Sequence, residues 1–301
     1  MLNSSSSSPF ITVVIITRNR ANILGDCLKS LVEQDLPKDR YELVVVDDGS
    51  ADRTPEVVKS FQSNTGLPVV RYVFQSHQGV NAARNAGIKN ASGQFVFFLD
   101  DDVLVLPDYL KRVWNLITKA PEFDGVGGPL RDRGGSKLHT CGNCSLANTD
   151  APGANAKGLV SSLIGGNMAL KAAAFKQAGL FDPAISGRGD ETEWFHRARG
   201  LKFFYDPALW VWHRRDNFNL RKLCRHSFVQ GLSVPLAQKK MQSSYRPKPM
   251  RILRALAHAL RRGCVWGVVL ALRETGAIIG HLKLKTAGLK NVPTDGKTAN
   301  G

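Results

Sequence analysis

Three consecutive carboxylates, Asp100, Asp101 and Asp102, follow the apolar run Phe95–Leu99, and no basic residue stands beside them in the sequence. A short apolar run that ends at an abrupt change of polarity is typical of a strand buried on both faces. The acids would then lie just past the carboxyl end of that strand, where open α/β sheets bind ligands. Because like charges repel, three packed carboxylates are costly unless a cation is shared, and oxygen ligands suit Mg2+ or Mn2+. A solvated acidic turn that caps the next helix is the alternative, and the triplet alone fits either.

The elements around the triplet alternate between apolar runs and helical spacing. A second buried run, Tyr41–Val46, also ends in acids, within Asp47-Asp48-Gly49-Ser50. Strands that alternate with helices predict an α/β fold with a mostly parallel sheet and right-handed crossovers. The predicted strands are 10–17, 41–46, 69–74 and 95–99, and the predicted helices are 21–34, a helix opened by Thr54 and Pro55, and 79–91.

The chain has no Gly-x-Gly-x-x-Gly after its first strand and no Gly-x-x-x-x-Gly-Lys-Ser/Thr loop. The usual dinucleotide fingerprint and the P-loop are therefore excluded. A divalent cation held by acids can instead neutralise a diphosphate at this sheet edge.

The second half of the chain supplies further candidate site residues. Gly165 and Gly166 interrupt an apolar run before Asn167, at a point where the backbone must come close to another group. Asp190 and Glu191 open a predicted helix that runs to Arg199. The predicted elements between and after them are a helix from Pro107 to Lys119, a strand 124–130, a polar loop 131–158 over the site, and short strands 203–205 and 209–212, the second closed by His213.

Taken in order, these segments resemble the family 2 glycosyltransferases, which have the GT-A fold, over roughly residues 11–225. The segments that carry the resemblance are Asp47–Ser50, the helix 79–88, the acidic triplet followed by Pro107, the loop Gly165-Gly166-Asn167, and Asp190-Glu191 followed by Arg197 and His213.

For the donor side, the resemblance implies a nucleotide-sugar donor linked to UDP, GDP or dTDP. Asp48 would accept a hydrogen bond from the base, and Thr17 and Arg18 would line the base pocket. Arg18 stands where the family more often has an aromatic residue. Arg84, on the helix before the acidic strand, is a further donor-binding candidate, although a solvated helix face would equally account for it.

For the metal, Asp100 and Asp102 match the outer positions of the family's Asp-x-Asp motif. Asp102 would hold Mg2+ or Mn2+ on the diphosphate, Asp100 or Asp101 would face the ribose, and His213 would complete the metal's shell. A packed histidine at the end of a strand is the alternative for His213.

For the acceptor side, the glycine loop with Asn167 would border the acceptor, and Glu191 stands where the family has its catalytic Asp. The order Asp190-Glu191 is the reverse of the family's, so either carboxylate is a candidate base; a helix N-terminal acid without a catalytic role is the alternative. The implied chemistry is that of an inverting, metal-dependent hexosyltransferase. A carboxylate takes the acceptor proton, and the sugar passes through an oxocarbenium-like state.

Two other functions are weighed against this one. A nucleotidyltransferase acting on a sugar phosphate would need a Gly-rich basic loop after the first strand, and Thr17–Arg20 lacks the glycines. A non-catalytic polyanion-binding protein would use the basic C-terminal region. The aromatic residues of that region are too sparse to stack on bases, so we expect no nucleic acid partner.

The charge of +16 is concentrated at the C-terminal end. From Arg214 onward 18 Lys and Arg stand against 3 acidic residues, whereas the residues before it carry 23 basic and 22 acidic side chains. The run Gly263–Leu272 is shorter than the roughly 20 apolar residues that span a bilayer. Helices are predicted at 221–232 and 252–272. We expect the basic helical region 233–301 to lie on an anionic membrane surface; a soluble helical hairpin packed on the catalytic domain is the alternative.

These observations predict three parts: a disordered Ser-rich tail (1–9), a GT-A glycosyltransferase domain (10–232) and a basic helical region (233–301). The tail has no apolar core of a signal peptide, and five scattered cysteines do not suggest a disulfide framework. We therefore expect a cytoplasmic enzyme at the inner face of the cell membrane. Its acceptor would be a glycan or lipid-linked molecule in polysaccharide, glycolipid or cell-wall synthesis.

Overall fold

The computed structural model describes residues 10–62, 66–132, 157–185, 190–214, 220–241, 249–250, 252–253, 256–257 and 265–286. The chain divides into two compact units, 1–219 and 220–301. The predicted tail 1–9 and most of the predicted loop 131–158 lie outside the described residues.

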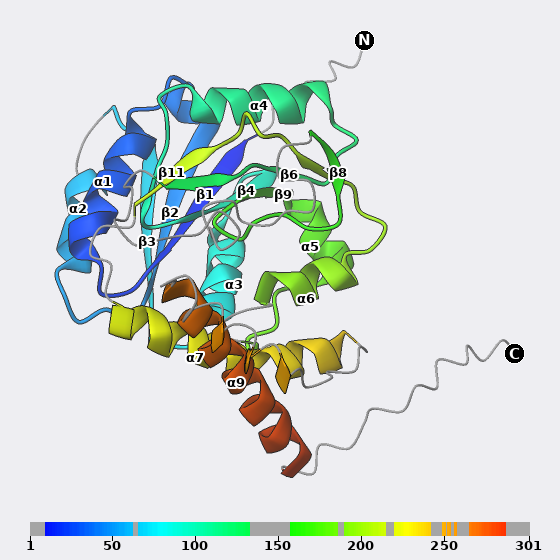
Figure 1. The fold of residues 1–301 in the computed structure, drawn as a ribbon. Coiled ribbons are helices and arrows are strands. Elements are labelled where there is room, and N and C mark those ends of the chain that lie inside the picture. The colour runs from blue at the N-terminus through cyan, green and yellow to red at the C-terminus, as the bar shows by residue number, and fades with distance from the viewer. Residues whose placement is uncertain are drawn as a thin grey trace, which may run out of the picture. The chain divides into compact units, whose positions relative to one another are not determined.

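The first unit is built on an eight-stranded sheet, in the order β3-β2-β1-β4-β9-β6-β10-β8 (Figure 1). The first four strands in sequence pair in parallel, and helices connect them, so the predicted α/β fold is confirmed. These elements are β1 (Ile11–Thr17), α1 (Ala21–Val32), a short 3-10 helix η1 (Lys38–Arg40), β2 (Tyr41–Asp48), α2 (Thr54–Gln62), β3 (Val69–Gln75), α3 (Val80–Asn90) and β4 (Phe95–Asp100).

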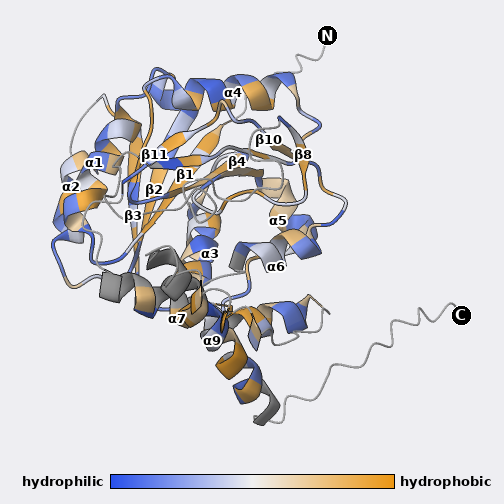
Figure 2. Ribbon diagram, in the orientation of Figure 1, coloured by the Kyte–Doolittle hydropathy of each residue, from blue (hydrophilic) through white to orange (hydrophobic). Residues whose placement is uncertain are grey.

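Both faces of the central strands are buried, as their unbroken apolar runs predict, and Figure 2 shows these strands as the most hydrophobic part of the first unit. Alternate residues of β1 point into different cores. Val13 and Ile15 pack with α1, α2 and α4 (Tyr109–Lys119), whereas Val14 packs with α3, α5 (Ala172–Ala178) and α6 (Asp190–Arg197). The sheet edge with the acids is therefore held between two layers of helices.

The second half of the sheet is mixed rather than parallel. β9 (Asn167–Lys171) runs antiparallel between β4 and β6 (Gly125–Gly127). β10 (Phe203–Tyr205) pairs in parallel with β6, and β8 (Gly158–Val160) closes this edge in antiparallel fashion. The antiparallel β9 brings the loop that carries Gly165 and Gly166 back to the carboxyl end of β4.

A second sheet of three strands, β5 (Val103–Leu104), β11 (Val211–His213) and β7 (Leu130–Asp132), lies beyond the acidic triplet. The predicted single strand 124–130 is wrong, because β6 and β7 belong to different sheets. The chain changes sheet at Gly128, where a Cβ atom would lie 2.0 Å from the carbonyl oxygen of Leu209. In this sheet His213 pairs with Val103, the residue that follows the triplet.

A buried polar face of α3 fixes the segment that leads to α6. The Asn85 side chain donates to the Phe181 carbonyl at 2.8 Å and accepts from the Phe181 N–H at 3.0 Å. One turn earlier, Asn81 donates to the carbonyls of Asp182 and Ile185 at 2.9 and 3.1 Å. Hydrogen bonds to buried backbone groups are costly to lose, so this segment is held firmly to α3.

The second unit contains two long helices, α7 (Leu220–Lys240) and α9 (Val265–Thr286). They cross closely at glycines: a Cβ atom on Gly231 would lie 2.1 Å from the Arg273 carbonyl oxygen, and one on Gly276 2.2 Å from that of Phe228. The predicted helix 221–232 is part of α7. Within the predicted helix 252–272, residues 252–253, 256–257 and the start of α9 are helical, and the others lie outside the described residues.

The division between the units falls after Asn219, whereas the predicted boundary at residue 232 falls inside α7. Among the described residues, no helix is both long enough and apolar enough to cross a membrane.

Candidate active site

The three acids at the carboxyl end of β4 have different surroundings, and Asp101 is the least exposed of them. Its Oδ2 accepts a hydrogen bond from Thr17 at 2.7 Å, and its Oδ1 lies 2.9 Å from Nη1 of Arg20. Burial raises the pKa of Asp101 to about 7, although Arg20 and the Thr17 hydroxyl favour the ionised form. Both oxygens of Asp101 are therefore used inside the protein.

Asp102 is shared between Arg20 and His213. Nη2 of Arg20 lies 2.5 Å from its Oδ2, and Nε2 of His213 lies 3.3 Å from its Oδ1. Burial opposes ionisation, but the hydrogen bonds and charges of His213 and Arg20 prevail and lower the pKa of Asp102 to about 2. Asp102 is therefore a carboxylate at neutral pH.

Asp100 lies against the glycine loop. A Cβ atom on Gly166 would lie 2.2 Å from Oδ2 of Asp100, so only glycine fits there unless the carboxylate moves. Burial raises the pKa of Asp100, and the charge of Asp102 adds to this effect. The close approach predicted from the two glycines is therefore confirmed.

Asp100, Asp102 and His213 form a group that fits a divalent cation. One ligand atom from each residue lies within 4.8 Å of the others. Two carboxylates and one imidazole suit Mn2+, and two carboxylates alone suit Mg2+, which keeps several waters.

Gly165 lies close to the side chains of both Arg84 and Glu191. A Cβ atom at this glycine would lie 2.7 Å from Nη2 of Arg84 and 3.5 Å from Oε1 of Glu191. Arg84 is buried, donates to Oδ1 of Asn81 at 2.9 Å and lies over the ring of Phe181. The half-buried Glu191 therefore lies next to Gly165, and Asp100 of the cation group lies next to Gly166.

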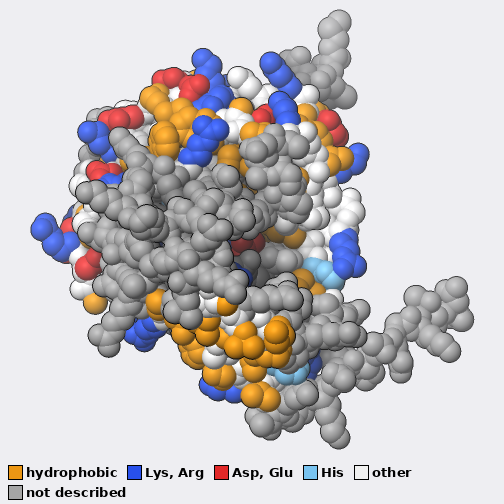
Figure 3. All heavy atoms as spheres, in the orientation of Figure 1, with side chains coloured by type: hydrophobic (Ala, Val, Ile, Leu, Met, Phe, Trp, Pro, Cys, Tyr) orange, Lys and Arg blue, Asp and Glu red, His pale blue; other side chains and the backbone are white. Residues whose placement is uncertain are grey.

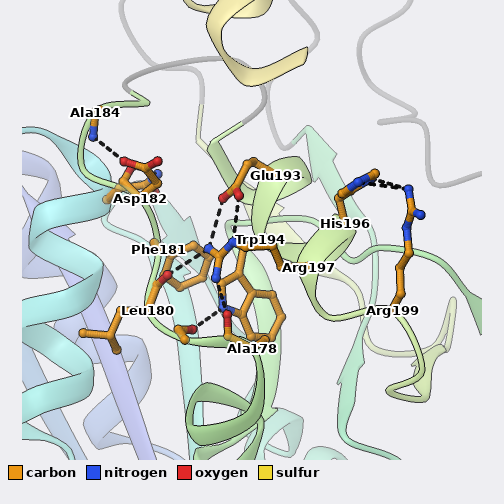
Figure 4. Close-up of polar contacts among 12 residues, drawn as sticks. Ala178, Leu180, Phe181, Asp182, Ala184, Glu193, Trp194, His196, Arg197 and Arg199 are labelled. Carbon is orange, nitrogen blue, oxygen red and sulfur yellow. Dashed lines mark hydrogen bonds and ion pairs between the residues drawn. The ribbon is translucent and has the colours of Figure 1, made fainter. Parts of the chain in front are cut away.

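The helix that carries Glu191, α6, is held in place by side chains one and two turns after Glu191 (Figure 4). Glu193 is buried and forms an ion pair with Arg197 at 2.7 Å, and Arg197 also donates to the carbonyls of Ala178 and Leu180. Trp194 donates to the Gly179 carbonyl at 2.8 Å. Arg197 thus pairs with Glu193 and ties α6 to the end of α5. The side chain of Asp190 lies outside the described residues.

Asp48, which is predicted to bind the nucleotide base, is surrounded by hydrogen-bond donors of the protein. It accepts hydrogen bonds from the side chain of Gln75 and from the backbone N–H groups of Gln78 and Gly79, and Nδ1 of His77 lies 2.7 Å from Oδ2. Burial opposes ionisation, but these bonds prevail and lower the pKa of Asp48. This carboxylate therefore organises the loop between β3 and α3.

The other candidates are more scattered. Thr17 is directed at Asp101, and Arg18 is exposed in the loop between β1 and α1. Asn167 is fully buried: it accepts from the Tyr109 hydroxyl and donates to the Leu209 carbonyl at 2.8 Å. Its amide therefore holds β9 to α4 and to the chain before β11.

Arg20 is a site residue that was not predicted from the sequence. It lies 80 positions before the first acid of the triplet, so its proximity depends on the pairing of β1 with β4. The signal that could have indicated this contact is the position of Arg20 just after the carboxyl end of β1, the strand next to β4.

The family model "Glycosyl transferase family 2" matches residues 12–179, which is more than half of the chain. The chain belongs to glycosyl transferase family 2. The matched segment contains the acidic triplet and the glycine loop, and it ends before α6 and His213.

Curated relatives agree with this family. The chain is 36% identical over 125 residues to glycosyltransferase AglE of Haloferax volcanii, covering 41% of this chain and 40% of that protein. It is 40% identical over 115 residues to a validoxylamine A glucosyltransferase of Streptomyces hygroscopicus subsp. jinggangensis, covering 38% and 26%. The matches thus span less than half of these relatives.

Two solved structures have a similar fold, that of the GT-A transferases. The mannosyltransferase PcManGT from Pyrobaculum calidifontis, in complex with GDP-Man and Mn2+, aligns with a TM-score of 0.62 at 18% identity, covering 92% of this chain and 88% of that one. S. aureus TarS 1–349 aligns with a TM-score of 0.56 at 14% identity, covering 92% of each chain.

Replacing Gly166 by Ala should displace the carboxylate of Asp100, because the new methyl group would overlap it. We expect Gly166→Ala to weaken Mn2+ binding by about 10- to 100-fold, as the loss of a supporting group around a metal typically does. The measurement is the free Mn2+ signal in electron paramagnetic resonance. Gly158→Ala is the control, because nothing lies within 4 Å of that added Cβ atom. Equal Mn2+ affinity in both variants would contradict the placement of Asp100.

Proposed function

We propose that this family 2 chain transfers a hexosyl group from a nucleotide-diphosphate sugar to an acceptor hydroxyl, with inversion at the anomeric carbon. The observation that supports the proposal is that Glu191 lies next to Gly165, while Asp100, a member of the group of Asp100, Asp102 and His213, lies next to Gly166. Glu191 would serve as the proton acceptor, and the cation group would bind the diphosphate.

The acceptor side needs a base. A sugar hydroxyl is a weak nucleophile, so a carboxylate must take its proton as the oxygen attacks the anomeric carbon. Glu191 is half-buried next to the backbone of Gly165 and belongs to a helix anchored by Glu193 and Arg197. Attack from the face opposite the diphosphate inverts the anomeric centre, and no covalent nucleophile is required.

The donor side needs positive charge. Asp100, Asp102 and His213 would hold Mg2+ or Mn2+, which stabilises the negative charge that develops on the leaving diphosphate. Arg18, which is exposed in the loop between β1 and α1, would contact the donor. Thr17 and Asp48 would contribute to the donor pocket mainly by holding its loops, since their side chains already have protein partners.

The solved structures support a nucleotide-sugar donor. PcManGT binds GDP-Man with Mn2+, and TarS 1–349 has been solved with UDP-GlcNAc. A similar fold therefore accommodates donors with different bases.

The composition of the second unit suggests a membrane surface as the place where the enzyme binds its acceptor. Met250 and Leu253 are each 58% exposed, in a region where basic residues greatly outnumber acidic ones. Figure 3 shows hydrophobic side chains gathered over the part of the view where Figure 1 draws α7 and α9. We propose that this unit rests on the anionic cytoplasmic face of a membrane and that the acceptor is a glycan or a lipid-linked molecule used in polysaccharide, glycolipid or cell-wall synthesis.

If Glu191 is the catalytic base, substitutions of Glu191 and of its neighbour Asp190 should reduce sugar transfer to different extents. Glu191→Gln keeps size and hydrogen bonding but cannot accept a proton, so transfer should fall by about 10² to 10⁴ while donor affinity barely changes. Asp190→Asn should cost much less. The measurement is sugar transfer, after a screen of UDP-, GDP- and dTDP-sugars by thermal shift with Mn2+ has identified the donor. The reverse order of effects would assign the base to Asp190, and a small loss in both variants would contradict a catalytic carboxylate here.

The membrane assignment predicts that charge on the exposed apolar residues weakens vesicle binding. In the full chain, the double variant Met250→Glu/Leu253→Glu should bind vesicles of anionic lipid at least about tenfold more weakly, because two apolar side chains no longer enter the interface. Val69→Glu is the control, since Val69 is 61% exposed on β3 of the first unit. Sedimentation with vesicles at moderate salt measures the difference. Binding of the double variant equal to that of the control would disprove the assignment.

A further inference from the structure

Arg20 bridges two of the three acids from a separate element. It stands at the start of α1, and its guanidinium donates through Nη1 to Oδ1 of Asp101 and through Nη2 to Oδ2 of Asp102. The two acids raise its pKa against the opposing effect of burial, so Arg20 is a fixed cation. A planar fork with two donors suits this bridge, and a lysine could not reproduce it.

The bridge determines which carboxylate oxygens face the cation group. Asp101 has Arg20 on one oxygen and the Thr17 hydroxyl on the other. Asp102 has Arg20 on Oδ2, and its Oδ1 faces His213 at 3.3 Å. Of the two acids, only Asp102 therefore presents an oxygen toward His213 and Asp100 with no guanidinium on it.

We propose that Arg20 is a specificity-determining residue for the cation: it keeps Asp101 out of the ligand set and limits Asp102 to a single oxygen. This inference rests on the proposed metal site. A small ion such as Mg2+ or Mn2+ needs few protein ligands in octahedral geometry, whereas Ca2+ takes 6–8 oxygens and often binds a carboxylate through both. Arg20 thus favours Mn2+ and Mg2+ over Ca2+.

A simpler role for Arg20 would be charge neutralisation alone. In that case its removal would increase the affinity for every divalent cation by the same factor, and a lysine would replace it fully. The ratio of Mn2+ to Ca2+ affinity separates the two roles, because a uniform change in charge leaves the ratio constant.

The experiment measures Mn2+ binding by electron paramagnetic resonance and Ca2+ by its competition with Mn2+, in the full chain without donor. We expect the ratio of Mn2+ to Ca2+ affinity to fall about tenfold in Arg20→Met and in Arg20→Lys. Arg53→Met is the matched control, because it removes an exposed arginine from the neighbouring loop between β2 and α2. Its ratio should equal that of the wild type. Thermal unfolding identifies any variant that fails to fold.

A wild-type ratio in both Arg20 variants would overturn the proposal, as would a wild-type ratio in Arg20→Lys with a changed ratio in Arg20→Met. Absence of Mn2+ binding to the wild type would overturn the metal site and this inference together. Sugar transfer is tested independently by comparing Glu191→Gln with Asp190→Asn. Failure of the proposed function can therefore be distinguished from failure of the inference about Arg20.

Discussion

The mutual repulsion of three adjacent carboxylates at the end of β4 is the constraint on which the site depends. Three side chains relieve it: Thr17 at the end of β1, Arg20 in the loop that follows, and His213 in the second sheet. The consequence is that the acids acquire different properties. Burial raises the pKa of Asp101 to about 7, whereas His213 and Arg20 outweigh burial and lower that of Asp102 to about 2. One acidic motif thus contains a carboxyl group held by protein partners and another that is charged at neutral pH.

The glycine loop also depends on close approach to charged groups. Gly165 and Gly166 allow the backbone to lie close to Arg84 and Asp100, and a side chain at either position would displace a charged group. Glu191 reaches this loop because α6 is tied to α5 through Arg197 and the segment before it to α3 through Asn85. Catalysis as proposed here therefore depends on polar bonds outside the glycine loop, because they determine where the base lies.

Local signals in the sequence were sufficient for the α/β core. Unbroken apolar runs such as Tyr41–Val46 identified buried strands, and acids at strand ends identified the ligand edge. The change of sheet at Gly128 could not be foreseen, because the steric limit there comes from Leu209, about 80 residues away in the chain. The contact of Arg20 with the acids was missed for the same reason, since the sequence shows no basic residue beside the triplet. Long-range pairing, rather than local propensity, decides both.

The central claim is that β4 and β11 bring Asp100, Asp102 and His213 together around one divalent cation. Pulsed electron paramagnetic resonance of the Mn2+-loaded full chain tests it directly, because a nitrogen ligand couples to the manganese electron spin. We predict the coupling of a single imidazole nitrogen in the wild type and its loss in His213→Gln. A spectrum without nitrogen coupling, or a coupling that persists in His213→Gln, would contradict the account.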